Sequence, residues 1–586
     1  ANPSGALNVA ILLIVLVIDM SENVWTKAFR AVSLPLIVGV LAALAAQLFV
    51  ALVVALNDLL LVSATSRASA AFTVATVAVP AVGGLLVGLL RHFGGAAVGH
   101  GPAEIIAAVQ TRNDALPAHA GWLSASSSLV SLGSGAAVGE YGPLVHIGGS
   151  LGATLARVFR SDITTINTAV ACSVAAAIST VFNAPIAGIL FAHEIILSHF
   201  APRTFAPVAL ASIVGYIVAN ALSAREPMLA AGQIGTPQLW EFGLFALLGI
   251  AGAGLAMLFM QAILGAGRAA ARIRRFQPLK PALAGLVLGL AALALPEVMG
   301  MGFGLLQSVT AGEFMPLGVL IVILVARLAA TAMCLGLGFT GGVFSPAMVI
   351  GSLLGAIFGI ALHQGLGLPV TDAAVYAICG MVAVTAPVIG APVTAVVIVL
   401  ELTGSYTLTL AALASVAISN AMVSRLFGRS MFDRQLKLRK LDLSAGRTKA
   451  ILESRDIAPL ITTNLVSIDE SATVDQARKA MLDQHLDQAF LTDGQGNYQG
   501  TVLLKDALSA APGMAAMEER NRDDVVMLEH LSIWRAMQRL RRFDGESVAV
   551  VDEHGKLVGA LYASRLISAY LDIQADLRAE EQIRAE

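Results

Sequence analysis

Apolar segments dominate the chain from about residue 31 to residue 427, with polar residues scattered singly between them. Several segments are interrupted by Gly and Pro, or are shorter than the ~20 residues that a helix needs to cross a bilayer. Short, interrupted segments in matching places are typical of transporters that bind their substrate near the middle of the membrane. We therefore expect an all-α polytopic membrane domain over residues 31–440.

Two motifs in this region recur in the same order and at nearly the same spacing. The apolar stretch that begins at Pro143 returns at Pro346, an offset of 203 residues, and the Ala-Pro motif at Pro185 returns at Pro392, an offset of 207 residues. Two ordered matches favour duplication over chance coincidence. The sequence thus predicts two structurally related halves, at about residues 31–220 and 240–427.

The chain begins with a shorter apolar run, from Ala6 to Ile18. It is too short to span a bilayer, and it lacks both the basic start and the small-residue cleavage site of a secretory signal. We expect residues 1–30 to form an interfacial or cytoplasmic helix.

Beyond Phe427 the pattern changes abruptly. Between Arg425 and Lys449 there are eight basic residues and two acidic ones. Basic residues next to membrane helices concentrate on the cytoplasmic side, so we expect a cytoplasmic C-terminus, joined by a linker at residues 441–456.

Residues 457–586 alternate short β-branched runs with amphipathic helical stretches, and this pattern occurs twice. The helical stretch from Val474 to Gln484 precedes the strand Ala489 to Thr492 in the first copy. Strands alternating with helices and turn signals predict a compact α/β unit. We place the two copies at about residues 457–512 and 520–575.

Composition agrees with a membrane protein: 57% of the residues are hydrophobic, 13% are charged, and the mean hydropathy is +0.78. The net charge of −2 gives no basic surplus, so nucleic acid is not expected as a partner. Three widely separated cysteines suggest neither a disulfide framework nor a metal cluster.

Three clusters of Gly and Pro carry the candidate chemistry. They are Gly99-His-Gly-Pro102, Gly133 to Pro143, and Thr340 to Pro346. Pro favours the first position of a helix, and Gly lets backbone N–H groups approach a ligand closely. A helix N-terminus carries about half a positive charge, so three of them can hold an anion without Lys or Arg. The alternative is that each cluster merely breaks a helix at a lipid interface.

The same residues resemble the CLC family of chloride channels and chloride/proton exchangers. Gly139-Glu-Tyr-Gly-Pro143, Gly341-Gly-Val-Phe-Ser-Pro346 and the segment Val181 to Phe191 carry the likeness, in the family's order. The resemblance implies two inverted-topology repeats of broken, tilted helices, and a homodimer with one chloride pathway per subunit. It implies transport across a cell membrane and no enzymatic activity. The compact loops between the apolar segments suggest a bacterial inner membrane.

The resemblance also assigns an anion pathway, held by backbone amides and a few side chains. The positions carried over are His100, Gly101, Pro102, Gly139, Glu140, Tyr141, Gly142, Pro143, Gly342, Val343, Phe344, Ser345 and Phe432.

Three positions depart from the family pattern. Tyr141 stands where the family has its gating Glu, Ile195 replaces the internal proton-transfer Glu of many exchangers, and Phe432 replaces a Tyr. A phenol has an ordinary pKa near ~10, so at neutral pH it does not imitate an anion as a carboxylate does. These departures favour a passive chloride channel.

Two other functions stay open. Glu140 would serve as a displaced gate in a chloride/proton or fluoride/proton exchanger, since a loop residue can swing by several ångströms. A membrane scaffold with a vestigial pathway is the third hypothesis, but it gives no reason for three Gly-rich helix starts.

Glu194 and Glu401 end the two matching Ala-Pro helices. A carboxylate in a membrane segment is a functional candidate by default, because burying it is costly. Their symmetric placement instead favours a structural role, in which each caps a neighbouring loop or helix N-terminus.

The C-terminal pair resembles CBS domains. Asp506 matches the residue that holds a ribose in nucleotide-binding pairs, whereas Arg565 stands there in the second copy. An adenine nucleotide is therefore the one candidate cofactor, and a dimerising or purely structural role is the favoured alternative.

Overall fold

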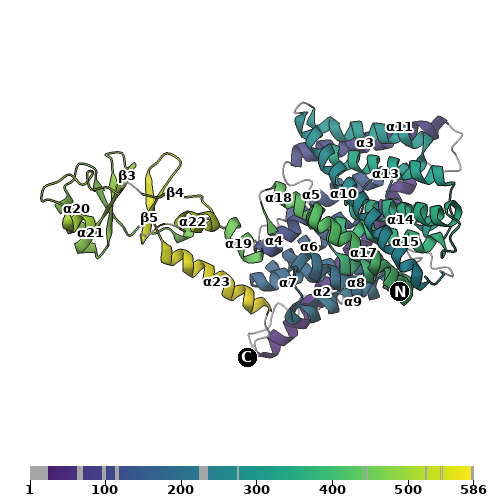
Figure 1. Ribbon diagram of the computed structural model, residues 1–586, viewed down its shortest axis with the longest axis horizontal. Helices are drawn as coiled ribbons and strands as arrows, with labels where there is room; N and C mark the ends of the chain where they lie inside the picture. Colours follow the sequence, from purple (N-terminus) through teal and green to yellow (C-terminus); the bar gives the residue numbers. More distant parts are fainter. Residues whose placement is uncertain are drawn as a thin grey trace. The chain divides into compact units, whose positions relative to one another are not determined.

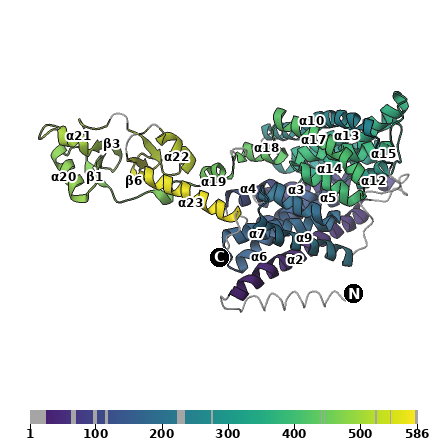
Figure 2. The same cartoon turned by 60° about the horizontal axis from the view of Figure 1, so that its bottom comes forward.

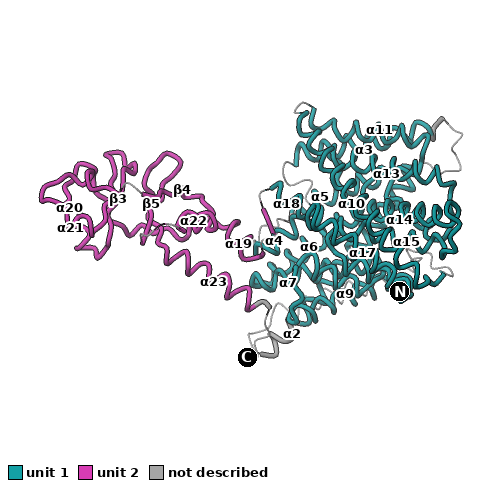
Figure 3. Tube along the Cα trace, viewed as in Figure 1, with its two compact units in different colours: residues 1–440 teal, residues 441–586 magenta. Residues whose placement is uncertain are grey.

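The computed structural model describes residues 24–61, 70–94, 101–112, 118–222, 235–273, 276–439, 441–443, 446–521, 524–541, 543 and 546–581. The chain forms two compact units, residues 1–440 and 441–586, which Figure 3 distinguishes by colour. The predicted N-terminal helix lies outside the described residues up to residue 23, and residues 24–30 form the start of the first long helix.

The first unit is helical throughout its described part, with long helices interrupted by short ones (Figure 1). Its first half contains α2 (Val24–Leu60), α3 (Ala70–Gly94), α4 (Pro102–Thr111), α5 (Ala118–Gly133), α6 (Tyr141–Val158), α7 (Ile163–Phe182), α8 (Pro185–Phe191), the π-helical segment η3 (Ala192–Leu197) and α9 (Pro202–Leu222). Its second half contains η4 (Leu239–Glu241), α10 (Phe242–Arg272), η5 (Gln277–Leu279), α11 (Lys280–Ala294), η6 (Pro296–Val298), α12 (Phe303–Thr310), α13 (Leu317–Leu337), α14 (Phe344–Ile360), η7 (Ala361–Gly365), α15 (Ala373–Ile389), α16 (Pro392–Thr403), α17 (Tyr406–Leu426) and α18 (Met431–Leu438).

Nine helices within the described residues are long and apolar enough to cross a bilayer. The segments Pro185–Leu197, Ala373–Ile389 and Pro392–Thr403 are apolar but shorter. The predicted mixture of spanning and broken helices is confirmed.

The two halves repeat the same packing. In the first half α6 packs on α7 and α2 packs on α9; in the second half α14 packs on α15 and α10 packs on α17. Figures 1 and 2 both show α14 and α15 side by side.

Glycines allow α3 and α11 to approach each other unusually closely. A Cβ atom on Gly285 would lie 2.0 Å from the backbone oxygen of Pro80, and one on Gly84 would lie 2.2 Å from that of Pro281. No side chain fits at such distances, so this helix pair depends on small residues, as membrane helix pairs often do.

The second unit consists of two α/β modules of the same topology. The first contains β1 (Val466–Asp469), α20 (Val474–Gln484), β2 (Gln488–Thr492), β3 (Tyr498–Leu503) and α21 (Leu504–Ser509), after α19 (Arg447–Ser454) and η9 (Ala458–Leu460). The second contains β4 (Val526–Leu528), α22 (Ile533–Leu540), β5 (Ser547–Val551), β6 (Leu557–Tyr562) and α23 (Ala563–Glu581).

In each module the first strand pairs in parallel with the second, and the second pairs antiparallel with the third. Phe490, Ala549 and Ala560 form a small buried core between the two sheets, with Tyr498 packed against it. The modules therefore pack on each other through their sheets.

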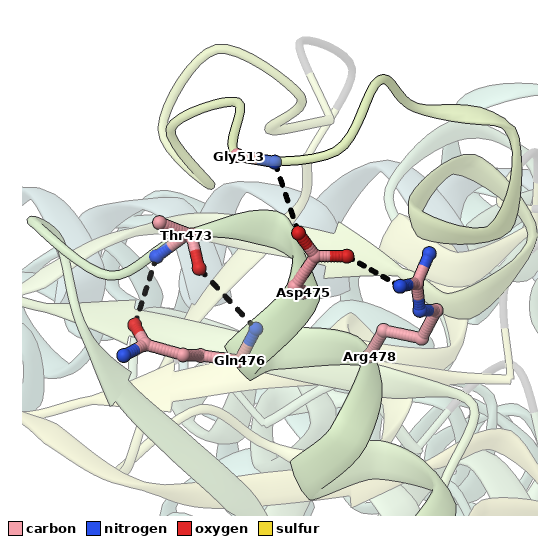
Figure 4. Close-up of polar contacts among 5 residues, drawn as sticks. All are labelled: Thr473, Asp475, Gln476, Arg478 and Gly513. Carbon is pink, nitrogen blue, oxygen red and sulfur yellow. Dashed lines mark hydrogen bonds and ion pairs between the residues drawn. The ribbon is translucent and has the colours of Figure 1, made fainter.

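Helix α20 begins with a capping box. The Thr473 hydroxyl accepts a hydrogen bond from the Gln476 N–H at 3.4 Å, and the Gln476 side chain accepts one from the Thr473 N–H at 3.0 Å (Figure 4). Asp475 pairs with Arg478 and accepts the Gly513 N–H at 2.9 Å. These contacts hold the start of α20 to the segment after α21.

Candidate functional site

The loops before α6 and α14 pair directly with each other. Gly139 N–H donates to the Gly342 carbonyl at 2.8 Å, and Gly342 N–H donates to the Gly139 carbonyl at 2.6 Å. A Cβ atom on Gly342 would come within 2.7 Å of the Gly142 nitrogen. The close pairing thus requires glycine, and it brings the N-termini of two helices from opposite halves together.

Hydroxyl groups on α5 hold the second of these loops. Ser127 Oγ and Thr340 Oγ1 lie 2.7 Å apart, and the Thr340 N–H donates to Ser131 Oγ at 3.1 Å. These residues are buried, so the bonds fix the approach to α14 within the protein interior.

The third helix start belongs to α4. Glu104 Oε2 accepts the Gly101 N–H at 2.6 Å, and Glu104 also forms an ion pair with Arg439, which follows α18. The negative charge of the Glu104 carboxylate is therefore balanced by the N-terminus of α4 and by the Arg439 guanidinium. This balance weakens the repulsion between Glu104 and an anion nearby.

A cavity of about 300 Å³ lies among these three helix starts. It brings together most of the predicted pathway residues, namely Gly101, Pro102, Gly142, Pro143, Gly342, Val343 and Phe432. Arg91 and Arg439 also contribute to its wall, against one acidic residue, Glu104. Helix N-termini and two guanidinium groups together favour an anion in this space.

The other predicted residues do not line the cavity. Gly139, Glu140, Tyr141, Phe344 and Ser345 are buried behind it, with Glu140 and Tyr141 each 2% exposed. His100 lies outside the described residues.

Tyr141 is enclosed by aromatic rings. Its ring stacks on Phe182 at a centroid distance of 4.2 Å, and it contacts Phe344 at 4.8 Å and Phe303 at 6.4 Å. The first residue of α6 is therefore held by packing with α7, α12 and α14.

Arg327 holds the loop that precedes Phe303, one of these aromatic residues. Its fully buried guanidinium donates to the carbonyls of Glu297, Met299 and Gly300 at 2.8–3.0 Å. These carbonyls belong to the loop that leads to Phe303, and the Gly300 N–H in turn bonds to the Gly135 carbonyl at 2.8 Å. This role was not predicted, because in the sequence Arg327 is only a lone Arg in an apolar helix.

Ile195 lies in the π-helical segment η3 and is 6% exposed. The segment packs against α4. An apolar side chain therefore occupies the predicted proton-relay position, and it neither accepts nor donates a proton.

Glu194 accepts hydrogen bonds from the start of α16, near whose end Glu401 lies, and Glu401 accepts them from the start of α8, which leads to Glu194. Glu194 accepts the N–H groups of Val393 and Thr394 at 3.1 and 2.9 Å. Glu401 accepts those of Ile186 and Ala187 at 2.8 and 2.7 Å. The predicted capping role is confirmed.

This reciprocal contact also fixes the relation of the two halves. The end of each helix segment meets the start of the other, which two neighbouring helices do only when they run antiparallel. Self-complementary contacts of this kind follow a two-fold relation. The repeats are therefore inverted relative to each other.

In the second unit, Asp506 is half-buried on α21, and Arg565 donates to the Leu460 carbonyl at 3.3 Å. The Tyr498 hydroxyl donates to Asp524, and burial raises the pKa of the Asp524 carboxyl to about 6.

Several residues that line the cavity were not predicted from the sequence, among them Arg91 and Arg439. Arg91 ends a long apolar helix, and Arg439 belongs to the basic stretch that was assigned only to membrane orientation. Their place beside the helix starts depends on contacts between residues hundreds of positions apart, such as the 2.9 Å bond from Arg91 to the Gly338 carbonyl.

Comparison with known proteins decides the family. The profile described as "Voltage gated chloride channel" matches residues 82–424, more than half of the chain. The chain belongs to the CLC family. The CBS domain profile matches residues 455–513 and 520–572, so a CBS pair follows the CLC domain.

Named relatives of this CLC chain include both channels and exchangers. It is 31% identical over 342 residues to the "Putative chloride channel protein ClcB-like" of Ralstonia nicotianae, covering 57% of this chain and 79% of that protein. It is 35% identical over 288 residues to the "H(+)/Cl(-) exchange transporter ClcA" of Cronobacter sakazakii, covering 48% and 61%. The function shared with these relatives is CLC-type chloride transport.

Solved structures agree on the fold. A eukaryotic CLC transporter aligns with a TM-score of 0.62 at 20% identity, covering 92% of this chain and 98% of that one. A slow cyanobacterial Cl⁻/H⁺ antiporter aligns with a TM-score of 0.62 at 20% identity, covering 70% and 98%.

Proposed function

We propose that this CLC protein is a passive, chloride-selective channel. The observation that carries the proposal is Tyr141, a neutral phenol at the family's gating position, enclosed by Phe182, Phe303 and Phe344. A passive pathway needs an anion site that does not have to take up a proton in each cycle. Backbone N–H groups at helix starts provide such a site.

Ile195, at the position of the family's internal proton-transfer Glu, supports the same proposal. Coupled exchange needs a group that accepts and releases a proton, and a buried isoleucine has none. Phe432 lines the cavity without a hydroxyl donor, so the inner end of the pathway binds an anion through fewer hydrogen bonds. Weaker binding favours rapid release, which conduction requires.

The pathway in this proposal runs through the cavity described above. The N–H groups of Gly101 and Gly342 already donate within the protein, so the starts of α6 and α14 at Gly142 and Val343 would face the anion. Arg91 and Arg439 would raise its local concentration. We also propose a homodimer with one pathway per subunit, in a bacterial inner membrane with a cytoplasmic C-terminus. The basic stretch after residue 425 supports that orientation.

One observation favours a second candidate, a chloride/proton or fluoride/proton exchanger. Glu140 is 2% exposed and lies between Gly139, which pairs with Gly342, and Tyr141. A buried carboxylate one residue from the gating position is a candidate displaced gate. The exchangers among the relatives make this the natural competitor.

The reversal potential of the purified protein in a planar bilayer separates these candidates. With equal chloride and a tenfold proton gradient across the bilayer, a passive channel gives a reversal potential of zero. An exchanger gives a potential that shifts with the proton gradient. The Glu140→Gln variant then identifies the gate, because only a protein that uses Glu140 loses the shift.

A further inference from the structure

A second cavity adjoins the first at Arg91 and is bounded by the ends of three membrane helices and the start of a fourth. It has a volume of about 460 Å³ and is bounded by the C-terminal ends of α3, α10 and α13 and by the start of α11. Its lining includes Gly88, Arg91, His92, Pro278, Lys280 and Gly338.

The charge in this cavity has one sign. Arg91, His92 and Lys280 line it, and no Asp or Glu is among its lining residues, all of which belong to the described part of the chain. The segment that contains Lys280 also lacks acidic residues, since none occurs between Glu241 and Glu297.

Hydrogen bonds to the backbone hold two of these cations in place. Arg91 Nη1 donates to the Gly338 carbonyl at 2.9 Å, and Lys280 Nζ donates to the Ala270 carbonyl at 2.6 Å and to Gln277 at 2.7 Å. A guanidinium has five N–H donors and an ammonium has three, so both groups keep donors for a ligand.

Three large apolar residues that are sequence neighbours of the lining residues are exposed. Phe93 follows His92 and is 82% exposed, and Phe276 precedes Gln277 and is 70% exposed. Leu279, next to Lys280, is 48% exposed. A ligand that fits both features has an anionic head and an apolar body.

We propose that this cavity binds the phosphate-bearing head group of an anionic membrane phospholipid. Arg91, His92 and Lys280 hold the phosphate, and the acyl chains lie along the apolar surface near Phe93 and Phe276. Basic pockets between membrane helices on the cytoplasmic side are suited to such head groups. Soluble phosphate shares the chemistry of the head group but not the apolar contacts.

The lipid site would also act on transport, because Arg91 lines both cavities. A bound phosphate takes up part of the positive charge that Arg91 otherwise presents to the anion site. Anion flux is then lower when the lipid is bound. This inference holds whether transport is passive or coupled to protons, so it stands apart from the proposed function.

Native mass spectrometry of the full-length protein tests the proposal directly. The protein is mixed with phosphatidylglycerol or phosphatidylcholine of the same acyl composition, and the fraction that retains one lipid is measured. We expect preferential retention of phosphatidylglycerol. The Lys280→Gln variant is expected to weaken this retention about fivefold, as for the loss of one basic contact. A fold check by size-exclusion chromatography accompanies each variant.

The matched control is Arg425→Gln, which removes an exposed cation from the last turn of α17, a helix that does not line the cavity. It should leave lipid retention unchanged. Equal retention of the two lipids by the wild type would overturn the proposal, even if Lys280→Gln did not fold. So would equal losses in Lys280→Gln and Arg425→Gln. Binding of inorganic phosphate without any preference for phosphatidylglycerol would assign the cavity to a soluble anion instead.

Discussion

At the residue scale, the proposed passive pathway depends on one side chain. Tyr141 begins α6 beside the paired glycines, and its ring packs against Phe182 and Phe344. A carboxylate at this place would compete with chloride while ionised and would withdraw its charge when protonated. A phenol does neither at neutral pH.

Replacing Tyr141 by Glu should therefore create an acid-sensitive gate. Chloride flux at pH 7 is expected to fall about tenfold, and to recover as the pH approaches the ordinary carboxyl pKa of ~4.3 from above. Flux from proteoliposomes at pH 4.5 and 7.5 measures both effects. Tyr141→Phe is the control and should keep wild-type flux. Unchanged flux and pH dependence in Tyr141→Glu would mean that this residue is not at the gate.

A second residue-scale prediction concerns Asp524 in the CBS pair. Burial raises the pKa of its carboxyl to about 6, well above its ordinary value, and the Tyr498 hydroxyl donates to it. The folded state therefore favours the protonated form. The stability gained from protonation is complete at low pH and is lost as the pH rises through about 6.

Asp524→Asn removes the buried charge but keeps an acceptor for Tyr498. We expect the C-terminal unit to resist urea better in this variant than in the wild type at pH 8, and equally at pH 4. Pulse proteolysis of the full-length protein in a urea series gives the midpoints. A variant that is less stable at pH 8 would show that the ionised carboxylate stabilises the fold.

At the element scale, the ends of the helices form the anion cavity and the contacts between the two halves. Helix starts bind glycine loops, capping carboxylates or the anion cavity, and each arrangement satisfies backbone groups that a helix leaves without a partner. Many of these helix ends could be predicted from the sequence. The predicted stretch from Val474 to Gln484 coincides with α20, and the predicted strand from Ala489 to Thr492 lies within β2.

The crossed carboxylates of α8–η3 and α16 should be important for stability. Glu194→Ala leaves three donors without their acceptor, the N–H groups of Val393 and Thr394 and the Thr394 hydroxyl. We expect a loss of about 1–3 kcal/mol for such unsatisfied groups. Thermal unfolding in detergent measures it, and Glu194→Gln, which keeps an acceptor oxygen, should lose less.

A proton-relay role for Glu194 predicts a different pattern. In that case Glu194→Gln would change the pH dependence of chloride flux while leaving thermal stability almost intact.

The capping box of α20 offers a test in the second unit. Thr473→Ala removes the acceptor for the Gln476 N–H, and the loss of such a cap costs about 1 kcal/mol. Thr473→Ser keeps the hydroxyl and should restore most of the stability. Urea midpoints of the two variants give the comparison, and equal losses in both would indicate that the methyl group matters instead of the hydroxyl.

At the scale of the whole molecule, the repeats were visible in the sequence because corresponding helices of the two halves carry a Pro at or near their start. Offsets of Pro143 and Pro185 with their counterparts were enough to predict two related halves. The hydrogen bonds of the buried Arg327 and the position of Arg91 between the two cavities could not be predicted from the sequence. Both depend on which distant backbone carbonyls the fold brings within reach of a guanidinium, and local patterns carry no information about that.

Chloride-driven proton movement tests the central claim most directly. Proteoliposomes loaded with chloride are diluted into low chloride, and chloride efflux and external pH are recorded together, with protein-free vesicles as the control for proton leak. For a passive channel we expect chloride efflux without uphill proton movement. Uphill proton movement driven by the chloride gradient would contradict it, and would direct attention to Glu140.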